Sequence, residues 1–304
     1  MNTLNYHSKF GGLWTDLIDA NSILEKKYSP STLRSRLEAF INHGYVIIPG
    51  AVSPELIDRY LEAFDTAIIS NTNLLASVPT HGPHDKSIIQ ATAADRLAPL
   101  TKYLDTYWFI KESHEIIFNE LTVEFLNAIF ECSPLAFQGL HFETGSTQRI
   151  HQDTAYVVSE KPLSLAASWL ALEDVQEGSG ELEYFEGSHR LPDWIYSNNF
   201  KHYNPDRDSQ DQHLAHLDFI ENESTKRGFP LKKFLPKKGD VLIWAADLAH
   251  GGSSITKPGV TRRSLVTHFT QSTISPNYFK NLPIERRVTK DSINNRGKFS
   301  TLYY

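Results

Sequence analysis

The hydrophobic pattern of the chain changes at about residue 133, and this change constrains the fold more than any other feature. Before it, apolar residues recur at helical spacing, and the stretch from Thr106 to Phe130 predicts one or two buried helices. After it, short β-prone runs alternate with turn residues such as Lys238-Gly-Asp240. The predicted strands are Ala136–Phe142, Thr154–Val158, Leu163–Leu172, Glu181–Phe185, Asp240–Ala245 and Ser264–Thr270. Helices followed by many short strands favour an α+β fold whose core is a jelly roll or barrel.

Start and stop signals place two helices and a strand before this change. Ser29–Thr32 offers capping residues for a helix that runs to about Asn42, and Gly44 is expected to end it. Tyr45–Ile48 then reads as a short strand. Ser53-Pro54-Glu55 opens a second helix, because proline is favoured in the first helical turn.

We interpret the whole chain as a single domain. Its parts are a mainly helical region 1–132, a jelly-roll core 133–270 and a C-terminal extension 271–304. Residues 191–235 are polar and lack regular periodicity. Because a long irregular segment inside a β-rich core is often functional, we interpret them as a lid.

The cysteine count, the net charge and the length of the apolar runs exclude or disfavour several classes of protein. The chain has 304 residues, and its single cysteine, Cys132, excludes an intrachain disulfide and a thiolate-rich zinc site. A net charge of −6 disfavours general nucleic-acid binding, which needs a basic surface. Apolar runs fall far short of the roughly 20 residues that span a bilayer, and the N-terminus lacks a signal-peptide pattern. We expect a cytoplasmic protein with a small-molecule substrate and no membrane or nucleic-acid partner.

A candidate metal site starts from His151-Gln-Asp153. Residues i and i+2 of a strand face the same side, so an imidazole and a carboxylate can reach one metal ion. Two decoys share this spacing, His216-Leu-Asp218 and His141-Phe-Glu143. We prefer His151 because a β-prone run follows it, whereas His216 lies in the irregular segment and is expected at the surface.

The third ligand is predicted to be His250, which follows the buried strand Asp240–Ala245. Gly251-Gly252 would let the backbone pass close to a bound ligand. The alternative is a hydrogen-bonded turn histidine. Two histidines and one carboxylate leave three open positions, which is typical of non-haem Fe(II) oxygenases.

Arg262 and Ser264 share one face of the last predicted core strand. A guanidinium beside a hydroxyl inside a barrel is a receptor for a carboxylate. The alternative is a structural partner, since an unpaired buried charge is costly. Arg263 has the opposite parity and is expected to face outward.

These residues resemble the phytanoyl-CoA dioxygenase family of Fe(II)- and 2-oxoglutarate-dependent oxygenases. The stretches that carry the resemblance are Phe40–Gly50, Ser53–Leu56, His151-Gln152-Asp153, Trp169–Val175, Gly180–His189, Gly239–Trp244, His250-Gly251 and Arg262-x-Ser264. The resemblance implies a double-stranded β-helix (cupin-like) core, Fe(II), 2-oxoglutarate and O₂. It also implies that Arg262 and Ser264 bind the distal carboxylate of 2-oxoglutarate.

By position in the family, Gln152 and Trp169 would lie near the cosubstrate or substrate. The alternatives are a turn-supporting Gln152 and a plain core Trp169. His189 is expected to order a hairpin turn. The loop Glu143–Gln148 departs from the family because it lacks the lysine often found there.

The implied reaction is hydroxylation of an unactivated C–H bond, coupled to decarboxylation of 2-oxoglutarate to succinate. Two alternatives are a metal-dependent cupin-like isomerase or epimerase, and a non-catalytic metal- or ligand-binding barrel. The basic run Lys226–Lys238 could steer an anionic substrate. It could equally balance the acidic residues just upstream, Asp206, Asp208, Asp211, Asp218, Glu221 and Glu223.

Overall fold

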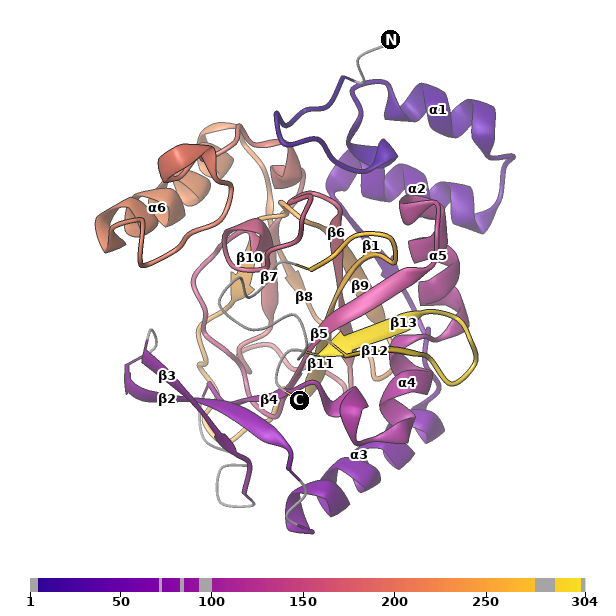
Figure 1. The fold of residues 1–304 in the computed structure, drawn as a ribbon, viewed down its shortest axis with the longest axis vertical. Helices are drawn as coiled ribbons and strands as arrows, with labels where there is room; N and C mark the ends of the chain where they lie inside the picture. The colour runs from indigo at the N-terminus through magenta and orange to yellow at the C-terminus, as the bar shows by residue number, and fades with distance from the viewer. Residues whose placement is uncertain (1–4, 71–72, 83–84, 93–99, 277–287, 302–303) are drawn as a thin grey trace.

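Two β-sheets form the centre of the molecule. The computed structural model describes residues 5–70, 73–82, 85–92, 100–276, 288–301 and 304 (Figure 1). The larger sheet runs in the order β1-β9-β6-β11-β5-β4-β2-β3, with β13 pairing β5 and β12, and the smaller one in the order β10-β7-β8. The core strands are β1 (Tyr45–Ile48), β5 (Pro134–Phe142), β6 (Leu165–Ala171), β7 (Leu182–Phe185), β8 (Leu231–Phe234), β9 (Val241–Ala245), β10 (His250–Gly252) and β11 (Ser264–Gln271).

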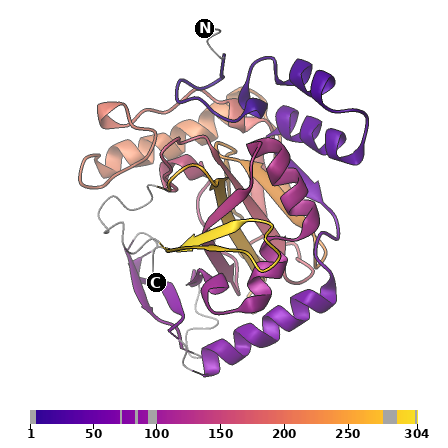
Figure 2. The same cartoon turned by 45° about the vertical axis from the view of Figure 1, so that its right-hand side comes forward.

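Five α-helices of the described residues before position 133 lie on one side of the large sheet, opposite α6 (Figures 1 and 2). They are α1 (Ala20–Lys27), α2 (Thr32–His43), α3 (Pro54–Ile69), α4 (Lys111–Ile117) and α5 (Glu120–Phe130). The Ser31 and Ser53 side chains accept backbone N–H bonds at the starts of α2 and α3, and Gly44 ends α2 at φ 82°. The capping signals therefore predicted both helices and strand β1 correctly.

The N-terminal part also contributes strands that the sequence did not predict. They are β2 (Leu75–Gly82), β3 (Asp85–Gln90) and β4 (Lys102–Leu104), which extend the large sheet beyond β5. In Figure 1 the β2–β3 hairpin projects at the lower left. At the other end of the chain, β12 (Val288–Asp291) and β13 (Lys298–Thr301) form a second hairpin.

One predicted strand is wrong. Thr154–Val158 is not extended: Asp153–Ala155 forms a 3-10 turn. The Asp153 carbonyl accepts the N–H groups of both Tyr156 and Val157, at 2.8 and 2.7 Å. Val157 then packs into a small apolar cluster with Phe137 and Leu165. The β-prone residues after the metal motif therefore pack into this apolar cluster and do not form a strand of either sheet.

The segment 191–235 holds a long helix, α6 (Gln210–Lys226), and strand β8. Its regularity was missed because the helix is polar and weakly amphipathic. A sequence signal was present, since Ser209 and Gln212 form a reciprocal capping box at its first turn. The interpretation of this segment as a lid, and the division of the chain into parts, remain predictions.

Two apolar clusters matter for the site. The larger packs the N-terminal helices against the large sheet. The second lies between the two sheets and is built from aromatic and aliphatic side chains such as Trp169, Trp244, Tyr184 and Phe234. Within the described residues, no helix combines the length and apolar character needed to cross a membrane.

Candidate metal centre

His151, Asp153 and His250 converge on one point between the sheets. All three are buried, and their ligand atoms lie within 4.8 Å of one another. Asp153 Oδ1 is 3.8 Å from His151 Nε2 and 3.7 Å from His250 Nε2. Metal–ligand bonds are roughly 2.0–2.2 Å long, so atoms at this spacing are close enough together to share one metal ion after small shifts. The residues chosen from sequence spacing are therefore brought together.

The hydrogen bonds of the two imidazoles point their free nitrogens at this centre. His151 Nδ1 lies 2.8 Å from the Arg149 carbonyl, and His250 Nδ1 lies 2.9 Å from the Leu248 carbonyl. A carbonyl only accepts, so each Nδ1 carries the proton and each Nε2 keeps its lone pair. Burial, helped by the neighbouring His250, lowers the pKa of His151 to about 3, which keeps its ring neutral.

The Asp153 carboxylate is oriented by a tryptophan. Trp244 Nε1 donates to Oδ2 at 2.7 Å, which leaves Oδ1 facing the two histidines. His268 Nε2 lies 3.4 Å from the same Oδ2. Burial works to raise the pKa of Asp153, but the surrounding imidazoles outweigh it and hold that pKa below its ordinary value. The Nε2 atoms of the two imidazoles and the Asp153 carboxylate form the N,N,O set suited to Fe(II).

Arg262 is buried at 3% exposure, and no carboxylate of the described residues lies within 4.0 Å of its guanidinium. Nη1 donates to Ser264 Oγ at 3.0 Å and Nη2 to the Thr144 carbonyl at 3.2 Å, while Nε has no partner. Burial lowers the pKa of Arg262 to about 10, so it remains a cation near neutral pH. The guanidinium can therefore receive an anion from outside the chain.

Trp169 and Gln152, which were predicted near the cosubstrate or substrate only by their position in the family, have different surroundings. Trp169 lies beside Arg262, with its ring 5.4 Å from the guanidinium carbon, and also packs edge-on against Phe234. Gln152 donates its amide to the Asp247 carbonyl at 2.8 Å, so its observed contact supports the turn. Neither contact assigns a role in binding the cosubstrate.

The alternative pair His141/Glu143 is a structural unit at the end of β5. His141 Nε2 contacts Glu143 Oε1 at 2.8 Å, and its Nδ1 contacts the Tyr60 hydroxyl at 2.9 Å. Arg263 lies with its Nε 3.4 Å from Glu143 Oε2. Arg263 is thus half-buried against acids and does not simply face solvent. His189 is half-buried and contacts the Ile41 carbonyl through Nε2 at 3.2 Å, beside the turn after β7.

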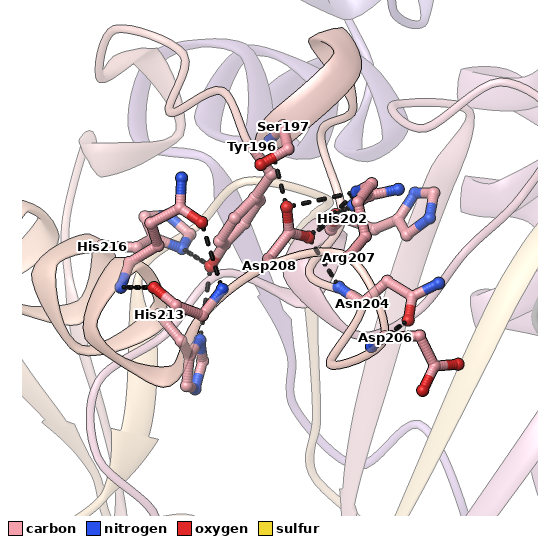
Figure 3. Close-up of polar contacts among 11 residues, drawn as sticks. Tyr196, Ser197, His202, Asn204, Asp206, Arg207, Asp208, His213 and His216 are labelled. Atoms are coloured by element: carbon pink, nitrogen blue, oxygen red, sulfur yellow. Dashed lines mark hydrogen bonds and ion pairs between the residues drawn. The ribbon is translucent and has the colours of Figure 1, made fainter.

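The prediction of a surface His216 is wrong, because this residue is only 2% exposed. Its Nδ1 contacts the Tyr196 hydroxyl at 2.8 Å (Figure 3). Its ring also stacks on Trp194. The adjacent turn of α6 carries His213, whose Nε2 lies 3.1 Å from the Tyr156 hydroxyl. Aromatic partners elsewhere in 191–235 thus bury a histidine that lies in a largely polar segment.

The segment 191–235 is also connected by ion pairs to the loops that carry the candidate metal ligands. Lys201 is buried and pairs with Asp193 and Asp247, both at 2.7 Å. Asp247 in turn accepts the Thr154 hydroxyl at 2.5 Å. Further along, Arg149 pairs with Asp218 of α6 at 2.9 Å. These contacts lie on both sides of the His151-Gln-Asp153 motif.

The role proposed for Gly251 and Gly252 needs correction. A Cβ at residue 251 would lie 2.6 Å from the Gln148 carbonyl oxygen, and one at 252 would lie 2.7 Å from the Ser146 hydroxyl. The close approach is therefore to the loop that precedes His151, and the glycines allow these two backbone segments to touch.

Lys102 of β4 was missed by the sequence analysis, because β4 was not predicted. Its Nζ lies 3.2 Å from Gln148 Oε1, and Gln148 Nε2 lies 3.3 Å from His151 Nε2. The loop Glu143–Gln148 has no lysine of its own, yet folding brings one to it. No local pattern could show this, since the contact depends on β4 pairing with β5.

The basic run Lys226–Lys238 is largely neutralised by acids. Its partners are mostly not the acids immediately upstream, of which only Glu223 pairs with it, through Lys226 and Arg227. The other pairs are Lys233 with Glu177 and Glu181, Lys237 with Asp174, and Lys238 with Asp58. These partners are brought from other elements by the fold.

A family comparison decides the classification. The family model described as phytanoyl-CoA dioxygenase (PhyH) matches residues 40–264, well over half of the chain. This protein belongs to the phytanoyl-CoA dioxygenase family. The matched range contains all three residues of the metal centre together with Arg262 and Ser264. Fe(II) and 2-oxoglutarate, which the resemblance implied, agree with this family and with the buried N,N,O donor set.

Solved structures confirm the jelly-roll fold of this family member. The non-haem α-ketoglutarate-dependent epimerase SnoN from nogalamycin biosynthesis is 14% identical, with 90% of this chain and 99% of that chain covered and a TM-score of 0.60. The carbocyclase SnoK from the same biosynthesis is also 14% identical, with 84% of this chain and 91% of that chain covered and a TM-score of 0.58. EctD from S. alaskensis, solved with 2-oxoglutarate and 5-hydroxyectoine, is 14% identical, with 81% of this chain and 78% of that chain covered and a TM-score of 0.55. No curated protein matches the sequence.

Proposed function

We propose that this protein is an Fe(II)- and 2-oxoglutarate-dependent oxygenase that hydroxylates an unactivated C–H bond of a small-molecule metabolite. One observation carries the proposal: a buried guanidinium without a carboxylate partner among the described residues and a buried His-Asp-His centre both border the cluster between the sheets, the first at Trp169 and the second at Trp244. Fe(II) with 2-oxoglutarate and O₂ supplies the oxidising power for C–H hydroxylation, and succinate and CO₂ are the coproducts.

The roles of the protein residues follow from their contacts. His151, Asp153 and His250 would hold the iron through Nε2, Oδ1 and Nε2, because hydrogen bonds engage the other polar atom of each side chain. Arg262 and Ser264 would hold the distal carboxylate of 2-oxoglutarate. Strand β11 supports this geometry, since residues 264, 266 and 268 share one face, with Ser264 at one end and His268 beside Asp153 at the other.

Charge balance also supports a dianionic cosubstrate. Fe²⁺ and ionised Asp153 sum to +1, and buried Arg262 adds a second positive charge. A doubly negative 2-oxoglutarate would neutralise the whole, which matters because unpaired buried charge is costly. The aromatic residues of the inter-sheet cluster would keep water from this interior.

Hydroxylation is favoured over halogenation because residue 153, one of the three proposed ligands, is a carboxylate. Halogenating relatives have a small residue at that position, which leaves room for chloride. Two neighbours of the same fold are described as an epimerase and a carbocyclase, so the outcome must be read from the product. Neighbours of the same fold were solved with nogalamycin RO and with 5-hydroxyectoine, and both are small organic molecules. This supports a small organic substrate for the present protein.

The test has two stages. Fe(II) and 2-oxoglutarate, added to the purified protein without oxygen, should give the weak visible charge-transfer band of a chelated keto acid. Asp153→Ala should not give it. Small-molecule classes are then screened for stimulated succinate formation, and a product heavier by one oxygen atom would establish hydroxylation. No band in the wild-type protein would contradict the proposal, while a product of unchanged mass would favour epimerisation.

A further inference from the structure

His268 is a buried histidine of β11 that is neither a candidate metal ligand nor a proposed contact of the cosubstrate. It is 3% exposed, and among the described residues neither of its ring nitrogens makes a hydrogen bond. One charged group lies close to it, because Asp153 Oδ2 is 3.4 Å from its Nε2. A buried polar group that has lost its bonds to water and gained no partner is costly, so such groups are rare without a reason.

The strand pairing places His268 and Trp244 on either side of one small residue. Ala167 of β6 lies directly opposite Trp244 of β9, and it also lies directly opposite His268 of β11. Directly opposed residues of antiparallel strands point their side chains to the same face of a sheet. The two large side chains therefore stand on one face, two strand spacings or roughly 10 Å apart, with only a methyl group between them.

The Asp153 carboxylate occupies the space between these two side chains. Its Oδ2 accepts the Trp244 Nε1–H at 2.7 Å on one side and lies 3.4 Å from His268 Nε2 on the other. Its Oδ1 faces His151 and His250. One oxygen of this carboxylate thus lies between two nitrogen atoms of the sheet, while the other is turned to the metal centre.

The chemistry of the contact determines which nitrogen of His268 carries the proton. A carboxylate only accepts hydrogen bonds, so an attractive contact with Oδ2 requires the hydrogen atom on Nε2. At 3.4 Å the contact is longer than an ordinary N–H···O bond. The small shifts that bring the three ligand atoms to one ion also allow this contact to shorten.

We propose that His268 is a positioning residue, which donates from Nε2 to Asp153 Oδ2 and, together with Trp244, orients the carboxylate so that Oδ1 faces the metal. This inference rests on the proposed function and deepens it. With one donor on each side of Oδ2, rotation of the carboxylate would break two hydrogen bonds at once. Outer hydrogen bonds of this kind fix the orientation of metal ligands and raise the affinity of the site.

The experiment compares two variants of His268 by titration with Mn²⁺. His268→Gln keeps an N–H donor at a similar distance from the backbone, so its metal affinity should remain close to that of the wild type. His268→Leu fills the space without a donor and should raise the dissociation constant about tenfold. Wild-type affinity in His268→Leu, or equal losses in both variants, would overturn the donor role.

NMR tests the same contact in the wild-type protein, whether or not His268→Leu folds. Long-range proton–nitrogen spectra of the Zn²⁺-loaded protein, with isotope-labelled histidine, show which ring nitrogen of each histidine carries the proton. His268, identified by the signal missing from His268→Gln, should carry it on Nε2. His151 and His250 should carry theirs on Nδ1. A bare Nε2 in His268 would overturn the inference.

A double variant tests whether His268 and Trp244 act on the same carboxylate. Either change alone already makes the carboxylate easier to rotate. His268→Leu/Trp244→Phe should therefore lose less metal affinity than the product of the two single losses. A full product of the two losses would show that the residues act independently and would contradict the shared role.

The outcomes also distinguish this inference from the proposed function. If the wild type binds metal and forms the charge-transfer band with 2-oxoglutarate, while His268→Leu binds Mn²⁺ as tightly, the inference alone is overturned. If the wild type binds no metal, the proposed function fails and this inference fails with it.

Discussion

His151 and His250 exchange both of their backbone hydrogen bonds, each N–H donating to the carbonyl of the other residue at 2.9 Å. Directly opposed residues of such an antiparallel pair point their side chains to the same face. The two imidazole rings consequently lie 4.5 Å apart, centre to centre. The backbone pairing therefore sets the spacing of two proposed ligands that come from distant parts of the chain.

Trp244→Phe should weaken metal binding by about 10- to 100-fold. Phenylalanine retains most of the packing against His250 but cannot donate to Asp153 Oδ2, so the carboxylate is free to rotate away. Titration with Fe(II) or Mn²⁺ measures the effect. Trp169→Phe is the matched control, since no hydrogen bond links Trp169 to Asp153, and it should leave metal affinity near the wild-type value.

Arg262→Lys should raise the KM for 2-oxoglutarate about 100-fold while metal affinity stays unchanged. Lysine keeps the charge but lacks the planar guanidinium group, which can donate to Ser264 and to a carboxylate at the same time. Ser264→Ala removes the hydroxyl beside the guanidinium and should raise the KM for 2-oxoglutarate about tenfold. Succinate formation against cosubstrate concentration gives both values, and an unaltered KM in Arg262→Lys would remove the proposed carboxylate receptor.

Lys201→Met should destabilise the protein by about 3–5 kcal/mol. The lysine side chain is 2% exposed and bridges Asp193 and Asp247, so its removal leaves the buried Asp247 carboxylate and the half-buried Asp193 carboxylate without a cation. Urea unfolding measures the loss. Adding Asp247→Asn should restore part of the stability, because one of the unpaired charges is then removed. A double variant less stable than Lys201→Met would show that the ion pair is not the cause.

His216→Gln should flatten the pH dependence of stability. Burial, with smaller effects of Lys201 and His213, lowers the pKa of His216 from 6.5 to about 3. Between these values the unfolded chain binds the proton more readily. The free energy of unfolding therefore falls with decreasing pH by up to about 1.4 kcal/mol per pH unit from this residue.

The difference between variant and wild type isolates that contribution. Asp16 acts with the opposite sign, because burial raises its pKa to about 7, and the wild-type slope alone mixes such effects. Urea unfolding of both proteins between pH 4.5 and 7 provides the comparison. Parallel curves would mean that His216 is not a buried neutral histidine.

Local sequence signals were reliable where a single side chain decides the backbone. Ser31 and Gly44 bound α2, and Ser53 with Pro54 starts α3, as predicted. The signals misled where tertiary contacts compete with them. Thr154–Val158 has β-prone residues but turns at Asp153, and α6 was overlooked although its capping box was visible.

The sequence by itself determined the helix caps, most of the core strands, the family, and the candidates His151, Asp153, His250, Arg262 and Ser264. These follow from residue type and spacing, which act over a few positions or are shared with relatives. Only the tertiary structure decided which nitrogen of each histidine faces the centre, that Arg262 has no acidic partner among the described residues, and that Lys102 reaches Gln148. Such contacts depend on strand pairing between distant segments, and hydrogen-bond geometry and burial exist only once those segments meet.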